Sequence, residues 1–558
     1  MAQKKNFITC DGNYAAAHIA YMFSEVAAIY PITPSSTMAE YIDEWAAYGR
    51  KNIFGDEVHV TEMQSEGGAS GAVHGSLQAG SLTSTFTASQ GLLLMIPNMY
   101  KIAGELLPGV FHVSARSVAT HALSIFGDHS DVMAARQTGF GFLASGSIQE
   151  IMDLAAVAHL TSIKTRIPFT HFFDGFRNSH EIQKVEALQE DQLSEMVDYE
   201  ALQKYRDSAL SPEHPVTRGT AQNPDIFFQA RESCNKFYEP VADVVDQYMQ
   251  EITRLTGREY HPFTFYGVQD AEYVIVAMGS VTQAIKEVVD YLNNKGEKVG
   301  LLNVHLYRPF SEKYFFQVLP KTVKRIAVLD RTKEPGAMGE PLYLDIRNLF
   351  YEKESAPLIV GGRYGLSSKD TNPSDIVAVF DNLMQNEPKN QFTIGIFDDV
   401  TYTSLPFQPE VSVVPEGTFE GRFYGIGGDG TVGANKNSIK IIGESTDKFA
   451  QGYFAYDSKK SGGLTVSHLR FGDHPIRSSY LVNHPRFVAC HVPAYLEKYD
   501  MLEGMMEGGT FLLNSIWDAE ETKNRIPDRM KKQLADKNIN FYTINATSLA
   551  EEIGLGGR

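Results

Sequence analysis

Three side chains in the first 120 residues could act on one ligand. Glu66 lies in EMQSEGGASGAVHG, where the small neighbours let a ligand approach the backbone closely. Thr33 stands in YPITPSS, at a Thr-Pro step that disfavours helix before the proline. Arg116 follows residues 110–115, whose alternating apolar and polar letters are typical of a strand. A carboxylate, a hydroxyl and a guanidinium would together suit a crevice that binds a polar ligand.

The elements around these residues favour one crevice. Residues 1 to about 180 alternate between strand-like and helix-like patterns, which indicates a parallel α/β sheet. Ligands bind such sheets beyond the carboxyl ends of the strands, and each of the three residues follows a strand-like piece. Taken singly, each has a plainer interpretation: Glu66 as an acid that opens a helix, and the others as a cap or a surface ion pair.

Two further units follow. A charged, mostly helical stretch turns proline-rich before residue 260, and a second strand-helix alternation runs from about 260 to 400. Its segment 281–296 has the apolar spacing of an amphipathic helix that ends at Gly296. A third unit opens near Glu416. We therefore predict three α/β domains, at residues 1–258, 259–414 and 415–558.

Glycines cluster in the third unit. In EGRFYGIGGDGTVGANKNSIKIIGE, strand-like letters lead into glycines and then into a helical pattern, so that backbone N–H groups could hold a phosphate. Lys459 and Lys460 could add positive charge. An ordinary turn and a solvated lysine pair are the alternatives.

Composition limits the possible functions. The formal net charge is -18, with 68 acidic against 50 basic residues, which disfavours nucleic acid as a partner. Cys10, Cys234 and Cys490 lie far apart without a CxxC, which predicts reduced thiols and neither a zinc ribbon nor an iron–sulfur cluster. We expect no metal site in this chain. The sequence lacks a signal-peptide pattern and a long apolar run, which predicts a cytoplasmic protein without a membrane segment.

A family resemblance rests on strings that occur in this order: YPITPSS, EMQSEGGASGAVHG, HVSARS, SIFGDHSDVMAARQTGF, LDRTKEPGAMGEPLYLD, GGDGTVGANKNSIKIIGE and SKKSGGLTVSHLRFG. The chain closely resembles the pyruvate:ferredoxin (flavodoxin) oxidoreductases of the 2-oxoacid:acceptor oxidoreductase family. The resemblance runs through all 558 residues but covers only about the N-terminal half of that long enzyme.

The resemblance implies a thiamine diphosphate enzyme. Such enzymes convert pyruvate, CoA and oxidised ferredoxin or flavodoxin into acetyl-CoA, CO2 and the reduced carrier. The first domain would resemble the doubly wound, pyrimidine-binding thiamine diphosphate domain of transketolase-like enzymes. The second would resemble the transketolase C-terminal domain, and the third, a CoA-contacting α/β domain, would be incomplete.

The resemblance also assigns roles by position. Glu66 would hydrogen-bond the aminopyrimidine of thiamine diphosphate. Arg116 would hold the pyruvate carboxylate with its planar fork, Thr33 would donate to substrate oxygens, and Ile125 would line the same site. The residues that would contact CoA are Gly427, Gly428, Asp429, Gly430, Thr431 and Lys459, with Lys460 as the alternative lysine.

Other parts of the family pattern are missing. The resemblance places the Mg2+ site, the diphosphate motif and the [4Fe-4S] clusters in the C-terminal half. The GDG at 428–430 is not the thiamine motif, because that motif needs an Asn pair further along, where this chain has Asp457 and Ser458. We therefore expect a partial thiamine diphosphate site, a truncated third domain and no turnover by this chain alone.

The resemblance names the C-terminal half, pyruvate, CoA and a ferredoxin or flavodoxin as partners, and it implies a homodimer. Three alternatives stay open. The substrate could be another 2-oxoacid, since Arg116 would read only the shared carboxylate. The chain could be a transketolase-like transferase, although it shows no diphosphate motif of its own. It could also be a catalytically incomplete CoA-binding or assembly module.

Overall fold

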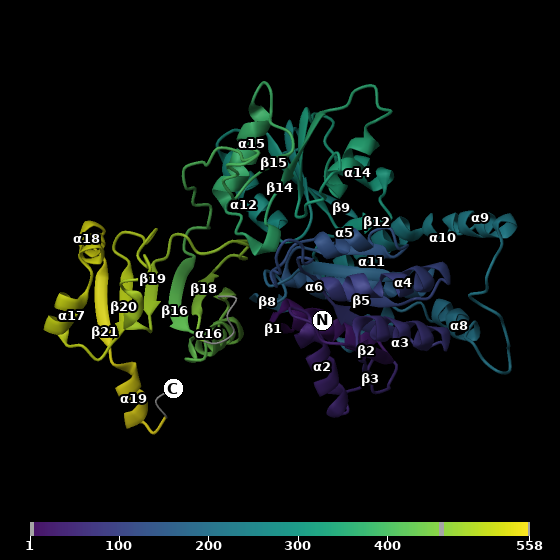
Figure 1. The fold of residues 1–558 in the computed structure, drawn as a ribbon, viewed down its shortest axis with the longest axis horizontal. Helices are drawn as coiled ribbons and strands as arrows, with labels where there is room; N and C mark the ends of the chain where they lie inside the picture. The colour runs from purple at the N-terminus through teal and green to yellow at the C-terminus, as the bar shows by residue number, and fades with distance from the viewer. Residues whose placement is uncertain (1–4, 457–461, 556–558) are drawn as a thin grey trace. The chain divides into compact units, whose positions relative to one another are not determined.

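The computed structural model describes residues 5–456 and 462–555 (Figure 1). The chain divides into two compact units. Unit 1 consists of Met1–Asn6, Asp11–Ser179 and Glu186–Val411, and unit 2 of Phe7–Cys10, His180–Val185 and Ser412–Arg558. Each unit is built from sheets with helices packed on them, so the predicted α/β fold is confirmed.

The first sheet of unit 1 has seven strands in the order β12-β6-β7-β5-β4-β2-β3. All neighbours are parallel except β12, which runs antiparallel to β6. The central strands are buried over their whole length, as expected for a parallel sheet covered on both faces. The strands are β2 (Val26–Ile29), β3 (His59–Glu62), β4 (Thr83–Thr87), β5 (Val110–Ala115), β6 (Gly141–Ser145), β7 (Phe169–Asp174) and β12 (Leu306–Arg308).

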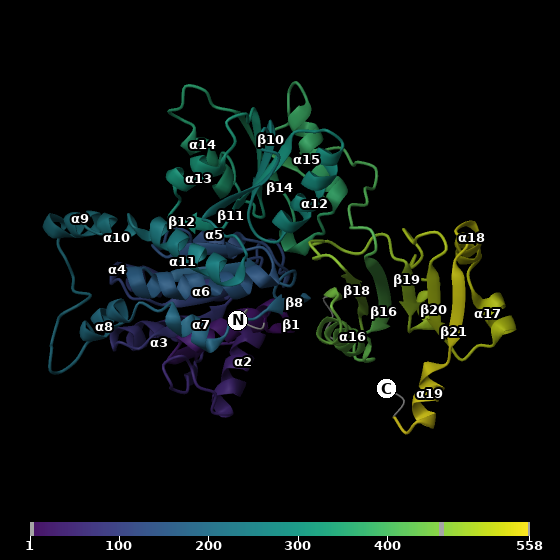
Figure 2. The same cartoon turned by 180° about the vertical axis from the view of Figure 1, so that it is seen from behind.

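Side-chain caps fix where the helices of this layer begin. Asp11, Ser65 and Ser147 accept hydrogen bonds from backbone N–H groups in the first turns of α1, α3 and α6. Helices α9 and α10 have no buried residue, and α9 is the longer of the two. Figures 1 and 2 show α9 at the outer edge of unit 1. The helices are α1 (Gly12–Phe23), α2 (Ser36–Ala47), α3 (Glu66–Gln78), α4 (Gln90–Gly104), α5 (Ser130–Ala135), α6 (Ile148–Thr165), α7 (Glu190–Glu195), α8 (Tyr199–Asp207), α9 (Pro224–Glu232), α10 (Asn235–Tyr238) and α11 (Val241–Thr256).

The second sheet of unit 1 has the order β15-β14-β13-β10-β11-β9. The helix predicted from residue 281 is confirmed, since α12 spans Val281–Asn294 and buries its apolar positions. Gly296 follows with a φ of 91°, a backbone conformation that suits glycine. The other elements are β9 (Phe263–Gly267), β10 (Tyr273–Ala277), β11 (Val299–Val304), α13 (Glu312–Val318), β13 (Arg325–Asp330), α14 (Pro341–Leu349), β14 (Leu358–Arg363), η1 (Leu366–Ser368), α15 (Pro373–Met384) and β15 (Phe392–Thr393).

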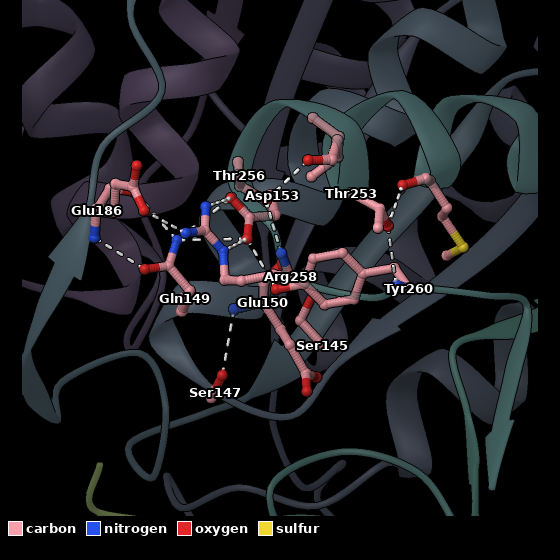
Figure 3. Close-up of polar contacts among 12 residues, drawn as sticks. Ser145, Ser147, Gln149, Glu150, Asp153, Glu186, Thr253, Thr256, Arg258 and Tyr260 are labelled. Carbon is pink, nitrogen blue, oxygen red and sulfur yellow. Dashed lines mark hydrogen bonds and ion pairs between the residues drawn. The ribbon is translucent and has the colours of Figure 1, made fainter. Parts of the chain in front are cut away.

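A buried ion pair joins the layers where the chain leaves α11 for β9 (Figure 3). Arg258 donates from Nε to Asp153 Oδ2 over 2.7 Å and from Nη2 to Oδ1 over 3.0 Å. Tyr260 donates to Oδ2 of the same carboxylate, and Arg258 Nη1 reaches Glu186. Because Asp153 on α6 is fully buried, removal of Arg258 would leave an uncompensated charge in the core.

Unit 2 has one eight-stranded sheet, in the order β1-β8-β17-β18-β16-β19-β20-β21. Two of its strands come from the N-terminal part of the chain, which the sequence did not indicate. Its elements are β1 (Phe7–Asp11), β8 (Ile182–Glu186), β16 (Phe419–Ile426), α16 (Thr431–Ser445), β17 (Phe449–Tyr456), β18 (Leu464–Gly472), β19 (Phe487–Cys490), η2 (Pro493–Tyr495), β20 (Thr510–Asn514), α17 (Ala519–Arg525), α18 (Asp528–Asp536), β21 (Asn540–Ile544) and α19 (Ala546–Glu552). The three-domain division stays a proposal.

Candidate active site

The carboxyl edge of the first sheet collects the three residues singled out from the sequence. Strands β2, β3, β4 and β5 are parallel, so their carboxyl ends meet at one edge. Thr33 lies in the turn after β2, Glu66 opens α3 after β3, and Arg116 follows β5 directly. This is the edge where open α/β sheets bind ligands.

Arg116 and Thr33 are in direct contact. Arg116 Nη1 donates to the backbone carbonyl of Thr33 over 2.7 Å, and its Nε donates to the carbonyl of Ser124 over 3.4 Å. Thr33 therefore contacts the guanidinium through its backbone carbonyl, and the role that the resemblance gives to its side chain stays a prediction. Ile125, next to Ser124, is partly buried in the segment that passes over Arg116.

Arg116 is a buried cation whose guanidinium is hydrogen-bonded to backbone carbonyls. It is 6% exposed, and no ion pair joins it to an acid among the residues that the structure describes. Burial lowers its pKa, while the charge of Asp131 acts in the opposite direction. Two backbone carbonyls do not neutralise a guanidinium, so this position favours an anionic ligand.

Asp131 organises the backbone around Arg116. Its Oδ2 accepts the N–H of Arg116 over 2.9 Å and the N–H of Ser89 over 2.7 Å. Burial raises the pKa of Asp131 to about 7, although these hydrogen bonds oppose the rise. Ser89, at the start of α4, has a φ of 52°, which is uncommon for a residue other than glycine.

Glu66 is a buried carboxylate whose oxygens have no hydrogen-bond partner in the described part of the chain. It is 7% exposed and faces the start of α4. A Cβ on Gly91 would lie 2.8 Å from Glu66 Cγ and 2.5 Å from Thr87 Oγ1. The lack of a side chain at Gly91 thus lets the start of α4 pack closely against Glu66. No contact between Glu66 and either Thr33 or Arg116 is described, so the three share an edge without forming one bonded cluster.

A second polar cluster lies on the same edge and was missed in the sequence. Asp174, the last residue of β7, forms an ion pair with Arg331, whose Nη1 lies 2.6 Å from Asp174 Oδ2. Asp174 Oδ1 lies 2.5 Å from His129 Nε2. Burial alone would raise the pKa of Asp174, but Arg331 and His129 hold it far below its usual value. Arg331 follows β13 directly, so the sequence pattern that could have indicated this cluster was again a charged residue at the end of a strand.

The glycine loop of unit 2 has the predicted arrangement. Residues 427–430 connect β16 to α16, with φ of 95° at Gly428 and 84° at Gly430. Asp429 accepts the N–H groups of Ile426 and Thr431, and Thr431 Oγ1 lies 2.6 Å from His491 Nδ1. A pocket of about 500 Å³ opens beside the loop at the carboxyl ends of β16, β19, β20 and β21. Its lining includes Asp429, His491, Asn514 and Thr547.

Lys459 and Lys460, together with Asp457 and Ser458, lie outside the described residues. Within residues 5–456 and 462–555, no group of three or more His, Cys, Asp or Glu side chains could hold a metal ion. The three cysteines are free thiols. Over the same ranges, no helix has both the length and the apolar character to cross a membrane.

Family models match most of the chain. "Pyruvate flavodoxin/ferredoxin oxidoreductase, thiamine diP-bdg" matches residues 18–250, "Pyruvate:ferredoxin oxidoreductase core domain II" matches 271–376, and "Pyruvate ferredoxin/flavodoxin oxidoreductase" matches 420–558. The three matches follow one another along the chain without overlap.

Curated relatives match along nearly the whole chain. The pyruvate:ferredoxin oxidoreductase of Moorella thermoacetica is 62% identical over 99% of this chain, and the pyruvate-flavodoxin oxidoreductase of Klebsiella pneumoniae is 63% identical over 99%. In both cases the chain spans 47% of the relative's length. A solved 2-oxoglutarate:ferredoxin oxidoreductase from Magnetococcus marinus, with 2-oxoglutarate, coenzyme A and succinyl-CoA bound, has a TM-score of 0.51 at 16% identity. The match covers 68% of this chain and 66% of that one, and it shows a shared fold.

Proposed function

Because this chain belongs to the pyruvate:ferredoxin/flavodoxin oxidoreductase family, we propose that it is part of an enzyme that oxidatively decarboxylates pyruvate. The complete enzyme would form acetyl-CoA and CO2 from pyruvate and CoA and would pass the electrons to ferredoxin or flavodoxin. The complete enzyme would be cytoplasmic and would form a homodimer.

The observation that carries the substrate class is the buried guanidinium of Arg116. A cation at 6% exposure without an acid partner among the described residues is costly unless an anion reaches it. The carboxylate of a 2-oxoacid has the charge and the planar shape that a guanidinium binds. The carbonyls of Thr33 and Ser124 would fix the guanidinium plane, and Ile125 would lie against the substrate methyl group.

Thiamine diphosphate fits part of this edge. Glu66 offers a buried acceptor at the carboxyl edge of the sheet, beside the closely packed Gly91. Within the described ranges, no group of three or more His, Cys, Asp or Glu side chains could hold a metal ion, and the fit proposed here is that of the pyrimidine end. When bound, thiamine diphosphate supplies a nucleophilic carbon that adds to the ketone of a 2-oxoacid. Glu66 would accept a hydrogen bond from the ring and tune its basicity, while the buried edge excludes water.

CoA is the proposed second substrate, at the glycine loop of unit 2. Gly427, Gly428, Asp429 and Gly430 precede the 15-residue helix α16, which Thr431 begins, and the N-terminus of a helix favours phosphate groups. The adjoining pocket of about 500 Å³ is large enough for part of a cofactor-sized ligand. Lys459 would add a positive charge to the same phosphates.

The chain alone would lack the path for electrons. An iron–sulfur cluster held only by cysteines needs four thiolates, and this sequence has three cysteines. We propose that the clusters and the Mg2+ site reside in a second portion that corresponds to the remaining length of the relatives. That portion would be an obligatory partner for turnover.

The proposal is tested by substrate binding. Pyruvate is titrated calorimetrically into the chain and into Arg116→Gln, with Arg308→Gln, a surface cation paired with Asp345, as the matched control. We expect Arg116→Gln to raise the Kd for pyruvate about 30-fold or more, because a charge-assisted hydrogen bond is lost, and Arg308→Gln to leave it unchanged. Equal affinity in all three proteins would remove Arg116 from the substrate site.

A further inference from the structure

A short turn in the second sheet layer has an unusual backbone. Residues Gly365–Ser368 follow β14, and Ser367 and Ser368 have φ of 54° and 53°. Two consecutive residues other than glycine in the left-handed region are disfavoured, because Cβ approaches the following carbonyl. Such a conformation persists only where surrounding contacts impose it, and these outliers gather at functional sites.

The contacts that impose it come from the segment between β5 and α5. Gly127 N donates to Ser368 Oγ over 2.8 Å, and Ser368 N donates to the Gly127 carbonyl over 2.7 Å. Ser367 N donates to Asp128 Oδ2 over 3.2 Å, and the hydroxyls of Ser367 and Ser124 are also hydrogen-bonded. The turn thus holds this segment at residues 124, 127 and 128.

The same segment covers Arg116. The Ser124 carbonyl accepts Arg116 Nε, and the Phe126 carbonyl accepts Ser117 N over 3.0 Å. Gly127 fits so closely that a Cβ would lie 2.4 Å from the Gly175 carbonyl. The segment has little room to move as long as its other end stays bound to Ser367 and Ser368.

The turn is itself fixed to the Asp174 cluster. Arg331 Nε donates to the Gly365 carbonyl over 2.9 Å, while Arg331 Nη1 is paired with Asp174. The Arg331 carbonyl in turn accepts His129 N over 2.8 Å. A continuous set of hydrogen bonds therefore runs from the end of β7 through Arg331 and the Ser367–Ser368 turn to the segment over Arg116.

We infer that Ser367 and Ser368 are positioning residues of the substrate site: they hold the 124–128 segment and thereby set the orientation of the Arg116 guanidinium toward the carboxylate of a 2-oxoacid. This inference rests on the proposed function. The turn belongs to a sheet layer that contributes none of the residues proposed to touch substrate, so it gives that layer a role in substrate affinity.

The first measurement tests, without any ligand, whether the Ser367–Ser368 turn holds the 124–128 segment. Hydrogen–deuterium exchange is followed across residues 117–130 in the chain, in Ser368→Ala and in the exposed control Ser355→Ala. Loss of the Ser368 hydroxyl leaves Gly127 N without its acceptor, so exchange in this segment should become about tenfold faster, with no change in the control. Unchanged exchange in Ser368→Ala would overturn the inference.

The second measurement is a double-mutant cycle with pyruvate as the calorimetric probe. Ser368→Ala should raise the Kd for pyruvate about threefold to tenfold in the presence of Arg116 and should add nothing in the Arg116→Gln background. An equal penalty in both backgrounds, or none in either, would overturn the inference. Should Ser368→Ala unfold, Ser368→Gly removes the same hydroxyl while relieving the left-handed backbone.

The two proposals fail in different ways. If Arg116→Gln weakens pyruvate binding but Ser368→Ala does not, the substrate site stands and the positioning role is wrong. If Arg116→Gln has no effect, the proposed function fails first, and the positioning role fails with it even where the exchange rates confirm the hydrogen bonds.

Discussion

At the scale of single residues, the site consists of groups that stability alone would not select. Arg116 is a buried cation held by carbonyls, and Glu66 is a buried carboxylate whose oxygens have no partner among the described residues. Natural proteins keep such groups mainly where function requires them, because activity and stability compete at active sites. Both residues are therefore expected to cost the fold free energy and to contribute to ligand binding.

Glu66→Gln tests this trade-off. The change removes a buried charge, so the free energy of unfolding in urea should stay level or rise by about 1 kcal/mol. In the complete enzyme the same change should lower kcat about 100-fold or more. Glu105→Gln is the control, since Glu105 is paired with His74 and Lys101 and its loss should lower stability. Near-normal kcat in Glu66→Gln would remove the assigned role.

The raised pKa of Asp131 predicts how the free energy of unfolding changes with pH. Its pKa is raised by burial from 3.8 to about 7, so between these values the folded chain binds a proton that the unfolded chain has released. The contribution of Asp131 to the free energy of unfolding is therefore lost as pH rises from about 4 to 7. The upper bound of this loss is about 4 kcal/mol. In Asp131→Asn this slope should vanish. Urea midpoints at pH 5 and pH 8 give the comparison, and parallel slopes in the two proteins would contradict it.

At the scale of elements, short turns after parallel strands carry the candidate site. Helix α4 follows Ser89, which has a φ of 52°, and brings Gly91 against Glu66 and Thr87. The close approach explains the glycine, because any side chain there would occupy the space beside the carboxylate. The start of α4 is thus shaped by its packing against Glu66 and Thr87.

Gly91→Ala and Gly75→Ala form a matched pair on helices α4 and α3. A Cβ at position 91 would lie 2.5 Å from Thr87 Oγ1, so overpacking should cost about 1–3 kcal/mol. At position 75 nothing lies within 4 Å, so alanine should stabilise by about 0.5–1 kcal/mol through its helix propensity. Urea unfolding measures both. Equal stability of the two variants would show that Glu66 and Thr87 can move to make room for a Cβ at position 91.

Patterns along the chain were enough to predict the α/β alternation and several of its elements. The strand at 110–115 and the helix from residue 281 were readable because their apolar periods are local. The placement of Arg116 after a strand also followed from local letters. The Asp174–Arg331 pair, the Ser367–Ser368 turn and the strands β1 and β8 were not predicted, because each depends on residues distant in sequence whose pairing leaves no periodic signal.

At the scale of the whole molecule, the proposed activity divides between this chain and the remaining length of its relatives. This chain would supply the substrate guanidinium, the ring-binding carboxylate and the CoA loop. The other portion would supply the metal, the diphosphate site and the clusters. Affinity for pyruvate and turnover of pyruvate are therefore separable properties, and this separation can be measured.

The separation predicts that this chain alone shows no pyruvate-dependent reduction of methyl viologen when thiamine diphosphate, Mg2+ and CoA are supplied. Three cysteines do not complete a four-thiolate cluster, so electrons have no carrier to enter. A complete enzyme assayed under the same conditions is the positive control. Appreciable turnover by the chain would show that a second portion is not required.

The sheet of unit 2 has a consequence for how the polypeptide matures. Strands β1 and β8 leave the ribosome early, whereas the strands that complete their sheet are translated only after Val411. Until then, the edge of β8 that pairs with β17 would be available to other nascent chains. Slow elongation should therefore favour aggregation of ribosome-bound fragments, and chaperones would be most needed before the strands that follow Val411 are translated.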